Sequence, residues 1–289
     1  MALTVAQWLK HAALELNAQN SARLEADLIL CHVLHWDRTA LYAHPEQPLD
    51  RNQLTSLNTL LQRRLQGEPI AYLVEQREFW SLPFHVNKNV LVPRPETELM
   101  VELAVNFLKQ QQPDKTCSVV DAGTGSGAIA VALSVEWTHL NRYPLSIIAS
   151  DQSQAALAVA RQNGQTHCPD TIQFVHSDWF AAFENDSFDL VLSNPPYLSE
   201  QDPHLEGNNL AFEPSDALVS GDDGLDAIRT IVSQAIDAGK PGAWVVLEHG
   251  ATQAAQVTQL MQAAAYTQVQ THQDLAGLDR ITSGYCPEY

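Results

Sequence analysis

From residue 117 onward, short apolar segments alternate with segments of helical periodicity. The pattern predicts strands at 118–121, 145–150, 172–176, 188–193, 243–248, 266–272 and 280–285, and helices at 127–137, 154–163, 224–238 and 252–264. Such alternation favours a mostly parallel sheet with helices on both faces, because parallel neighbours need long crossover connections. We therefore expect a doubly wound α/β fold that binds its ligands at the carboxyl ends of the strands.

The sequence before residue 96 follows a different pattern. Apolar residues recur at helical spacing after Thr4, after Ser21 and over 54–65, which predicts a small helical bundle. Short aromatic and β-branched segments over 78–92 predict a β-hairpin with a further extended segment at 90–92, and a helix over 97–111 follows. We expect three parts: a helical bundle over 1–75, a β-hairpin linker over 76–95 and an α/β domain over 96–289.

The composition is typical of a globular protein from a reducing compartment. A chain of 289 residues is long enough for two domains, and 45% hydrophobic residues can fill their cores. No apolar run has the length of a membrane span, and the first residues lack the layout of a signal peptide. The cysteines are far apart and predict free thiols: Cys31, Cys117, Cys168 and Cys286. We expect a cytoplasmic protein without a membrane partner.

The net charge of −18 is concentrated in the second half of the chain. Residues 117–289 contain 5 Lys and Arg against 21 Asp and Glu, and residues 162–228 contain no Lys or Arg. A protein that binds nucleic-acid phosphates there would need cations, so a nucleic-acid substrate is not expected. A basic protein partner is compatible with this charge. His32 and His35 share a helix face without a third ligand nearby, so no metal site is expected either.

Polar signatures follow the predicted strands at the points where they end. A glycine-rich loop comes after the first strand: Asp121-Ala122-Gly123-Thr124-Gly125-Ser126-Gly127. Asp151 closes the second strand, where a carboxylate can accept hydrogen bonds from both hydroxyls of a ribose. Asp178-Trp179 follow the third strand and offer a carboxylate for an exocyclic amine and a ring for stacking. The glycine-rich loop alone would also fit NAD, but several polar strand ends in succession favour a nucleoside site.

The fourth strand ends in Asn194-Pro195-Pro196-Tyr197. Two prolines stiffen this loop and hold it extended, because each fixes its own φ and restricts the residue before it. The Asn194 side-chain oxygen and the Pro195 carbonyl can then accept hydrogen bonds from one planar –NH₂ group, and Tyr197 offers a face to it. The loop therefore predicts a site for an amide or an aromatic amine, although an ordinary proline-rich turn would have the same sequence.

Together these motifs resemble the class I S-adenosylmethionine-dependent methyltransferases. The Asn-Pro-Pro-Tyr form is similar to the members that methylate planar nitrogens, namely adenine N6 and glutamine side-chain amides. Further segments resemble the peptide chain release factor glutamine methyltransferases: Arg94-Pro95-Glu96-Thr97-Glu98, Phe212-Glu213-Pro214, Gly221-Asp222-Asp223-Gly224-Leu225, Glu248-His249-Gly250 and Asp274-Leu275-Ala276-Gly277-Leu278-Asp279-Arg280. The likeness extends over nearly the whole chain and implies a seven-stranded Rossmann-like methyltransferase sheet.

The resemblance also implies a cofactor, a reaction and roles for single residues. The cofactor is S-adenosylmethionine, which leaves as S-adenosylhomocysteine, and the reaction methylates the glutamine of the Gly-Gly-Gln loop of release factors. The implied cofactor-binding residues are Gly123, Thr124, Gly125, Ser126, Gly127, Asp151, Trp179 and Asn194. The implied substrate-binding residues are Asn194, Pro195, Pro196 and Tyr197, with Asn194, Pro195 and Tyr197 as the catalytic residues. We expect a monomer whose partners are release factors.

Three alternatives remain open at this stage. A glutamine methyltransferase that acts on a ribosomal protein shares the Asn194–Tyr197 loop, although Glu248-His249-Gly250 and Arg94–Glu98 disfavour it. An adenine-N6 methyltransferase of DNA or RNA is disfavoured by the lack of Lys and Arg over 162–228. A non-catalytic module that docks a basic loop would transfer no methyl group to any protein.

Overall fold

The computed structural model describes residues 3–16, 21–112, 116–142, 144–205 and 209–288. The chain divides into two compact units. The first unit comprises Met1–Gln76 and His204–Phe212, and the second comprises Arg77–Pro203 and Glu213–Tyr289. The boundaries expected at 75 and 95 remain a prediction, and they did not anticipate that residues 204–212 belong with the first unit.

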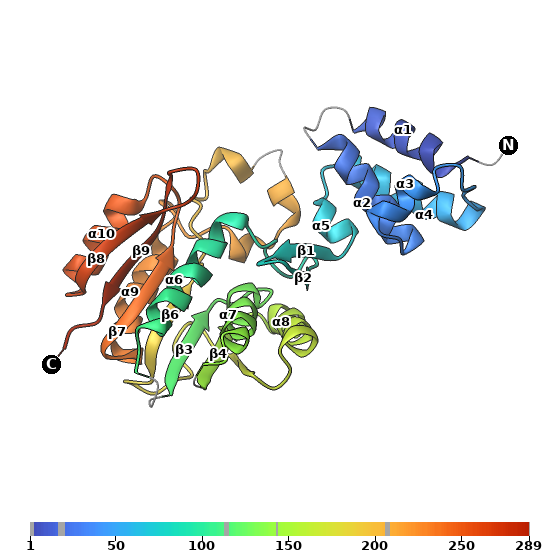
Figure 1. The fold of residues 1–289 in the computed structure, drawn as a ribbon. Helices are drawn as coiled ribbons and strands as arrows, with labels where there is room; N and C mark the ends of the chain where they lie inside the picture. The colour runs from blue at the N-terminus through green and yellow to red at the C-terminus, as the bar shows by residue number, and fades with distance from the viewer. Residues whose placement is uncertain (1–2, 17–20, 113–115, 143, 206–208, 289) are drawn as a thin grey trace. The chain divides into compact units, whose positions relative to one another are not determined.

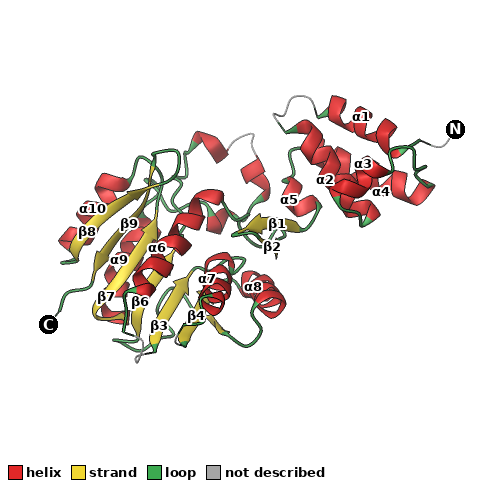
Figure 2. Ribbon diagram, viewed as in Figure 1, coloured by secondary structure: helices red, strands yellow, loops and turns green. Residues whose placement is uncertain are grey.

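The first unit is helical, as the sequence predicts (Figures 1 and 2). Its α-helices in the described ranges are α1 (Val5–Glu15), α2 (Ala22–Leu34), α3 (Arg38–Ala43), α4 (Arg51–Leu65) and α5 (Ile70–Leu73). Thr4 caps α1 through a reciprocal capping box with Gln7. The core includes Trp8, Ile29 and Leu57, all without exposed surface.

Two local features of the first unit were not anticipated from the sequence. Ser21 precedes α2 but makes no side-chain cap; its hydroxyl donates to the Glu25 carboxylate at 3.0 Å instead. The short helices α3 and α5 were not predicted. They have six and four residues, which is too few for the apolar spacing of a helix to be visible in a sequence. Asp37, whose carboxylate accepts from the Ala40 N–H, marks the start of α3.

A short hairpin precedes the large sheet of the second unit. Its strands are β1 (Gln76–Phe79) and β2 (Leu82–His85), and α6 (Glu98–Lys109) follows after the 3₁₀ turn η1 (Pro95–Thr97). The segment at 90–92 is not a strand, which corrects the expectation for this region. The Val92 N–H donates to the Glu213 carboxylate at 2.9 Å and not to a neighbouring strand.

The large sheet is seven-stranded within the described residues, and its strand order is β5-β4-β3-β6-β7-β9-β8. Its strands are β3 (Cys117–Ala122), β4 (Leu145–Asp151), β5 (Ile172–His176), β6 (Phe188–Ser193), β7 (Gly239–Glu248), β8 (Thr267–Gln273) and β9 (Asp279–Tyr285). Pairing is parallel from β5 to β7, and β9 is antiparallel to both of its neighbours. The doubly wound α/β fold expected from the sequence is confirmed.

Helices cover both faces of this sheet (Figure 2). The remaining α-helices of the described chain are α7 (Ala128–His139), α8 (Gln154–His167), α9 (Asp226–Ala238) and α10 (Ala254–Ala263). Successive residues of a strand point to opposite faces. Accordingly, Val245 of β7 belongs to one core cluster with Ile231 of α9, whereas Trp244 stacks on Phe107 of α6 with ring centroids 5.0 Å apart.

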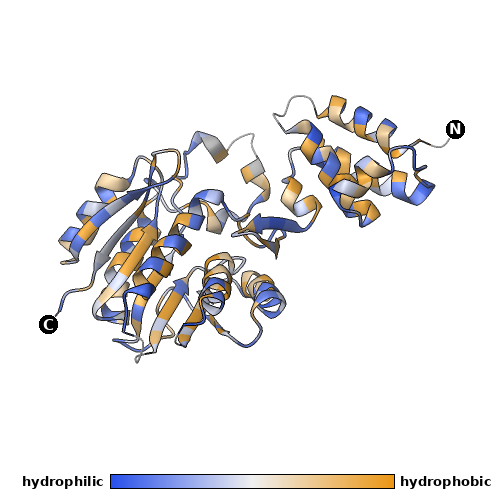
Figure 3. Ribbon diagram, viewed as in Figure 1, coloured by the Kyte–Doolittle hydropathy of each residue, from blue (hydrophilic) through white to orange (hydrophobic). Residues whose placement is uncertain are grey.

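The hydropathy of the strands follows this burial. In Figure 3, β3, β4 and β7 are hydrophobic over most of their length, whereas the edge strand β8 is largely hydrophilic. Continuous apolar strands are typical of parallel sheets that are buried on both faces. None of the helices in the described ranges combines the length and the apolar character that crossing a bilayer requires.

Candidate active site

A cavity of about 470 Å³ lies at the carboxyl ends of β3, β4, β5 and β6. The loop after β3, the end of β4 and the segment after β5 form one part of its wall. Asn194 and Pro196 after β6 form another part, and residues 214–217 contribute a third. This is the edge at which doubly wound sheets bind ligands, and the volume falls within the range of about 300–1,000 Å³ that is usual for ligand sites.

The glycine-rich loop bends sharply between β3 and α7. Gly127 begins α7 with φ of +82°, and a β-carbon there would lie 3.2 Å from the Ala160 side chain of α8. A side chain at this position would therefore strain both the backbone and the packing of α7 on α8. Gly125 also has positive φ (+55°), and a β-carbon there would meet nothing within 4 Å. The loop thus leaves free space beside its backbone on the cavity side.

Asn163 of α8 supports this loop from below. The side chain is 1% exposed, and its amide nitrogen donates to the carbonyl oxygens of Ser126 (2.9 Å) and His85 (3.0 Å). Its oxygen accepts from the His85 N–H at 2.8 Å. One buried amide therefore joins the glycine-rich loop to β2. The sequence analysis missed this residue because nothing in a helical segment marks an Asn that points inward.

Asp151 lies where the sequence placed it, at the end of β4 and in the cavity wall. One carboxylate oxygen accepts from the Gly125 N–H at 2.9 Å and the other from the Ser153 N–H at 2.8 Å. Burial raises the pKa of Asp151, and these two backbone donors act in the opposite direction. Each oxygen keeps a lone pair for a further donor, so the carboxylate can still accept from a ligand hydroxyl.

Trp179 contributes an aromatic wall to the cavity. A β-carbon built on Gly123 would lie 3.2 Å from the Trp179 ring, so the ring lies directly beside the glycine-rich loop. The neighbouring Asp178 is exposed and is not part of the cavity wall. The ring proposed for stacking is therefore at the cavity, while the carboxylate proposed for an exocyclic amine is not.

Asp121, the first residue of the glycine-rich motif, is fully buried beneath the loop. One of its oxygens accepts from the Thr124 hydroxyl at 2.6 Å and from the Ala130 N–H at 3.2 Å. The other oxygen has no hydrogen-bond partner among the described residues. Burial raises the pKa of Asp121 to about 7 despite these two donors. Asp121 thus ties the loop to the first turn of α7, a role that its place in the motif did not reveal.

Asn194 lines the cavity and has a buried acceptor oxygen. Its amide nitrogen donates to the Thr97 hydroxyl at 3.2 Å, and its oxygen is buried without a hydrogen-bond partner in the described part of the chain. Just before it, the Ser193 hydroxyl donates to the Ala122 carbonyl at 2.6 Å and fixes the end of β6 to the end of β3. A buried polar atom that lacks a partner is rare in a folded protein and calls for a ligand or another explanation.

The other residues of this loop differ in their access to the cavity. Pro196 belongs to the cavity wall, whereas Pro195 is buried and is not among the wall residues. Tyr197 packs against the core cluster under α9 and α10, and it is also absent from the wall. The roles of Pro195 as an acceptor and of Tyr197 as a stacking face therefore remain predictions.

A buried ion pair holds the wall opposite the glycine-rich loop. Glu213 accepts from the Val92 N–H at 2.9 Å and from the Arg94 guanidinium at 2.6 Å. The Glu213 side chain is 1% exposed, whereas that of Arg94 is 32% exposed. The two hydrogen bonds join the segment before η1 to the segment that carries Pro214 and Asp216. The sequence analysis quoted Arg94 and Glu213 only for the resemblance and did not pair them.

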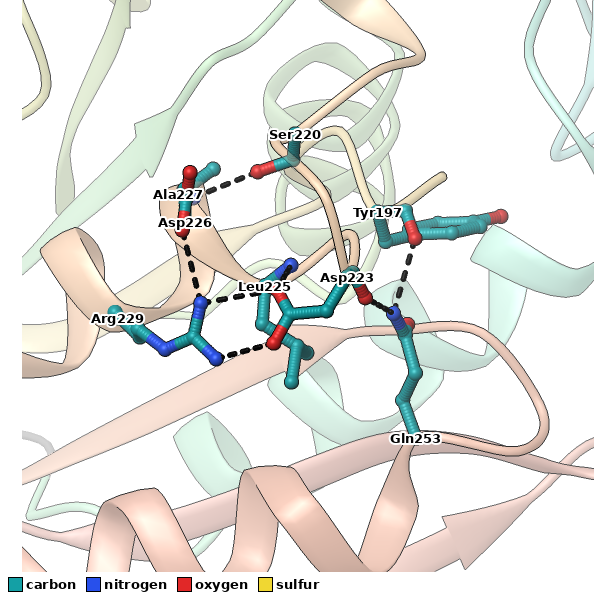
Figure 4. Close-up of polar contacts among 8 residues, drawn as sticks. All are labelled: Tyr197, Ser220, Asp223, Leu225, Asp226, Ala227, Arg229 and Gln253. Carbon is teal, nitrogen blue, oxygen red and sulfur yellow. Dashed lines mark hydrogen bonds and ion pairs between the residues drawn. The ribbon is translucent and has the colours of Figure 1, made fainter. Parts of the chain in front are cut away.

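The loop after Tyr197 is fixed from beneath by a polar cluster (Figure 4). The Gln253 side chain donates to the Tyr197 carbonyl at 3.0 Å. A β-carbon on Gly224 would lie 2.3 Å from the same carbonyl, and its φ is +77°, so only glycine fits there. On the outer side, Arg229 forms ion pairs with Asp223 and Asp226. Gly221–Leu225 is therefore a packing element that supports the Asn194–Tyr197 loop.

The seven-stranded sheet, its glycine-rich loop and the acidic end of β4 define a class I methyltransferase. Two family models match the chain: PrmC N-terminal domain over residues 7–74 and Methyltransferase small domain over residues 98–221. The chain is 41% identical to the release factor glutamine methyltransferase of Xylella fastidiosa strain Temecula1, over 92% of this chain and 94% of that protein. The protein of the same name from Escherichia coli K12 is 41% identical over 96% and 97% of the two chains.

The chain belongs to the release factor glutamine methyltransferase family. A third relative of that name, from Coxiella burnetii, is 42% identical over 90% of each chain. A crystal structure of the release factor-specific protein-(glutamine-N5) methyltransferase from Alicyclobacillus acidocaldarius covers 71% of this chain and 100% of that one at 26% identity. Its TM-score of 0.41 is too low for a comparison of the two sites.

Proposed function

We propose that this enzyme transfers the methyl group of S-adenosylmethionine to the side-chain amide nitrogen of a glutamine in peptide chain release factors, in their Gly-Gly-Gln loop. Membership of the family indicates the class of reaction, which is methyl transfer. The observation that carries the assignment to an amide is the oxygen of Asn194, a cavity-wall residue: this oxygen is buried and has no hydrogen-bond partner among the described residues. A carboxamide N–H donor would satisfy this oxygen, and a carboxylate would not.

The cavity residues fit this cofactor. Free space lies beside the Gly125 backbone, the Asp151 carboxylate can accept ribose hydroxyls, and the Trp179 ring offers a face to the adenine. S-adenosylmethionine, when bound, supplies an electrophilic methyl group on a sulfonium. Gly123 to Gly127 would hold its methionine part and ribose, and Asn194 would lie near the methyl group.

The chain's own task is to orient a weak nucleophile. The nitrogen lone pair of a carboxamide is delocalised into the carbonyl, and the pKa of its N–H groups is too high for a side-chain base to remove a proton beforehand. If the Asn194 oxygen and the Pro195 carbonyl each accept one N–H, the nitrogen is held in a fixed direction. Orientation of this kind can lower a barrier by about 7–11 kcal/mol.

The same two acceptors also help as the reaction proceeds. Positive charge develops on the nitrogen while the new N–C bond forms, and oxygen acceptors on its N–H groups stabilise that charge. After transfer, the nitrogen loses one proton to water and becomes a neutral secondary amide. The chain forms no covalent intermediate in this scheme.

A labelling experiment tests the proposal. The full-length protein is incubated with S-adenosylmethionine labelled at the methyl group and, in separate reactions, with unmethylated release factor, ribosomal proteins or DNA. We expect label on the release factor and its loss when the loop glutamine is replaced by alanine. Label on a ribosomal protein or on DNA alone would identify one of the alternative substrates, and no label on any of them would identify a docking module.

A further inference from the structure

The buried side chain of Asn163 joins three segments of the methyltransferase unit. Its amide nitrogen donates to the Ser126 carbonyl at 2.9 Å and to the His85 carbonyl at 3.0 Å, and its oxygen accepts from the His85 N–H at 2.8 Å. The reverse orientation would place the oxygen against two carbonyls, so these contacts fix the direction of the amide. Asn163 therefore pairs with both backbone groups of His85, as a residue of a neighbouring antiparallel strand can.

The third bond holds the glycine-rich loop at a point where its backbone can easily turn. Ser126 lies between Gly125, with φ of +55°, and Gly127, with φ of +82°. Glycine adopts several backbone conformations at similar energy, so its neighbours do little to fix the Ser126 carbonyl. Ser126 also belongs to the cavity wall. The bond from Asn163 thus sets the direction of a peptide group beside the cofactor.

We propose that Asn163 is a positioning residue for the cofactor: it holds the Ser126 carbonyl and so keeps the glycine-rich loop in the conformation that binds S-adenosylmethionine. The inference rests on the proposed function for its cofactor but not for its substrate. Asn163 is 1% exposed and is not among the residues of the cavity wall. It therefore acts through the loop and not by contact with the reacting atoms.

The same junction links the cofactor loop to the β1–β2 hairpin. If the hydrogen bonds of Asn163 favour the binding conformation of the loop, bound cofactor must favour those hydrogen bonds to the same extent, because coupling free energies are reciprocal. The effect should be local to the His85 end of the hairpin. The other end is held separately, since the Trp80 N–H donates to the Glu98 carboxylate at 2.7 Å.

The test uses two variants of the full-length enzyme. Asn163→Leu keeps the approximate size of the side chain and removes all three hydrogen bonds. Asn163→Asp keeps an acceptor for the His85 N–H but places an oxygen where the donor to Ser126 stood. For each variant we measure S-adenosylhomocysteine affinity by calorimetry, the Tm, and kcat and KM for S-adenosylmethionine with unmethylated release factor.

The matched control is His167→Phe, one helical turn further along α8. The His167 Nε2–H donates to the Pro83 carbonyl of β2 at 2.8 Å, and its ring centroid lies 5.5 Å from that of Phe84. The variant keeps an aromatic ring and removes the hydrogen bond from α8 to the hairpin. It therefore separates anchoring of the hairpin from positioning of the cofactor loop.

We expect both Asn163 variants to raise the Kd of S-adenosylhomocysteine by about tenfold, which corresponds to a binding-competent loop in about a tenth of the molecules. The KM for S-adenosylmethionine should rise by a similar factor, while kcat at saturating cofactor stays close to that of the wild type. His167→Phe should lower the Tm without a change in Kd. The inference is overturned if the Asn163 variants keep the wild-type Kd, or if His167→Phe weakens binding as much as they do.

Hydrogen exchange in the wild type tests the inference even if an Asn163 variant does not fold. With S-adenosylhomocysteine at 100 times its Kd, exchange of the His85 amide should slow by up to about a hundredfold, and the Trp80 amide should respond less. Equal slowing of the two amides, or none, would overturn the inference. A wild type that does not bind S-adenosylhomocysteine would refute the proposed cofactor. Binding without methylation of the release factor would refute only the proposed substrate.

Discussion

The two compact units differ in how some of their buried carboxylates are paired. In the helical unit, Glu25 is 6% exposed and is fully paired: Arg64 donates to its two oxygens at 2.7 and 3.1 Å, and the Ser21 hydroxyl donates at 3.0 Å. Arg64 itself is 2% exposed. The pair joins α2 to α4, which are far apart in sequence. Its charges compensate each other, so the helical unit contains a buried ion pair that serves its own packing.

In the methyltransferase unit, two buried carboxylates form no ion pair within the described residues. Asp121 and Glu248 each keep one oxygen without a partner in the described ranges, and burial raises the pKa of both to about 7. Each lies next to a loop that forms the cavity wall. Ionisable groups with such pKa shifts are found preferentially at functional sites. Burial alone therefore does not distinguish a functional carboxylate from a structural one.

The largest expected effect concerns the ion pair of the helical unit. An Arg64→Met variant leaves Glu25 buried without its cation, and we expect a loss of about 3–5 kcal/mol in the free energy of unfolding. The double variant Glu25→Met/Arg64→Met should recover most of that loss, because it leaves no uncompensated charge. Chemical denaturation followed by circular dichroism measures both. A double variant as unstable as the single one would contradict this account of the pair.

In the methyltransferase unit, Asn194→Ala should lower turnover and leave cofactor binding nearly unchanged. We expect kcat to fall by about 10²–10³-fold, as when one preorganised hydrogen-bonding group is removed from an active site. S-adenosylmethionine affinity should stay close to that of the wild type, because the glycine-rich loop and Asp151 are unchanged. Steady-state kinetics and calorimetry separate the two quantities. An equal loss of turnover and of cofactor affinity would contradict the assignment of Asn194 to the substrate amide.

The pH dependence of the free energy of unfolding should be a smaller effect, and its sign follows from the raised pKa of Asp121. The folded state raises the pKa of Asp121 from its ordinary value to about 7, so between about pH 4 and 7 the folded chain holds this proton more tightly than the unfolded chain does. Stability should therefore fall as pH rises through that window, by at most about 1.4 kcal/mol per pH unit for this group.

An Asp121→Asn variant isolates that contribution. Its free energy of unfolding should depend less steeply on pH between 4 and 7 than that of the wild type, while Glu248 continues to contribute with the same sign. Denaturation series at several pH values across this range provide the measurement. An unchanged slope would show that Asp121 keeps its ordinary pKa in the folded protein.

The smallest effect is expected at the outer side of the cluster in Figure 4. Arg229 and its acidic partners are largely exposed, and exposed ion pairs contribute little because water and salt screen them. Arg229→Ala should leave the Tm unchanged within error. Gln253→Ala is the matched comparison, because it takes a donor from the buried Tyr197 carbonyl and an acceptor from the Gly250 N–H. A larger Tm decrease for Arg229→Ala than for Gln253→Ala would reverse this ranking.

Much of the fold could be predicted from the sequence because it depends on local patterns. The strands expected at 172–176 and 188–193 have the observed bounds, since short segments rich in apolar residues between turn residues indicate a strand without tertiary information. The expected extended segment at 90–92 forms no strand for a tertiary reason. Its Val92 N–H is taken by Glu213, a residue more than a hundred positions away.

The candidate site likewise contains some residues that could be predicted from the sequence and others that could not. The residues that follow strand ends, Asp151 and Asn194, could be located because parallel strands bring their carboxyl ends together. The residues that support these two side chains could not be located from the sequence. Thr97 and Asn194 meet only in the folded chain, and each belongs to a segment with an ordinary local explanation. A pattern of residue types does not reveal which polar side chains will lose their contact with water.

The path of the chain has a consequence for synthesis on the ribosome. The helical unit includes His204–Phe212, and a β-carbon on Gly67 would lie 3.5 Å from the Phe212 ring. The N-terminal helices therefore leave the exit tunnel long before the last piece of their own unit has been translated. The contact between Gly67 and Phe212 can form only after β3 to β6 have emerged. A fragment that ends at residue 76 would accordingly lack part of the unit it is meant to represent, and cutting the gene there would not yield two independent halves.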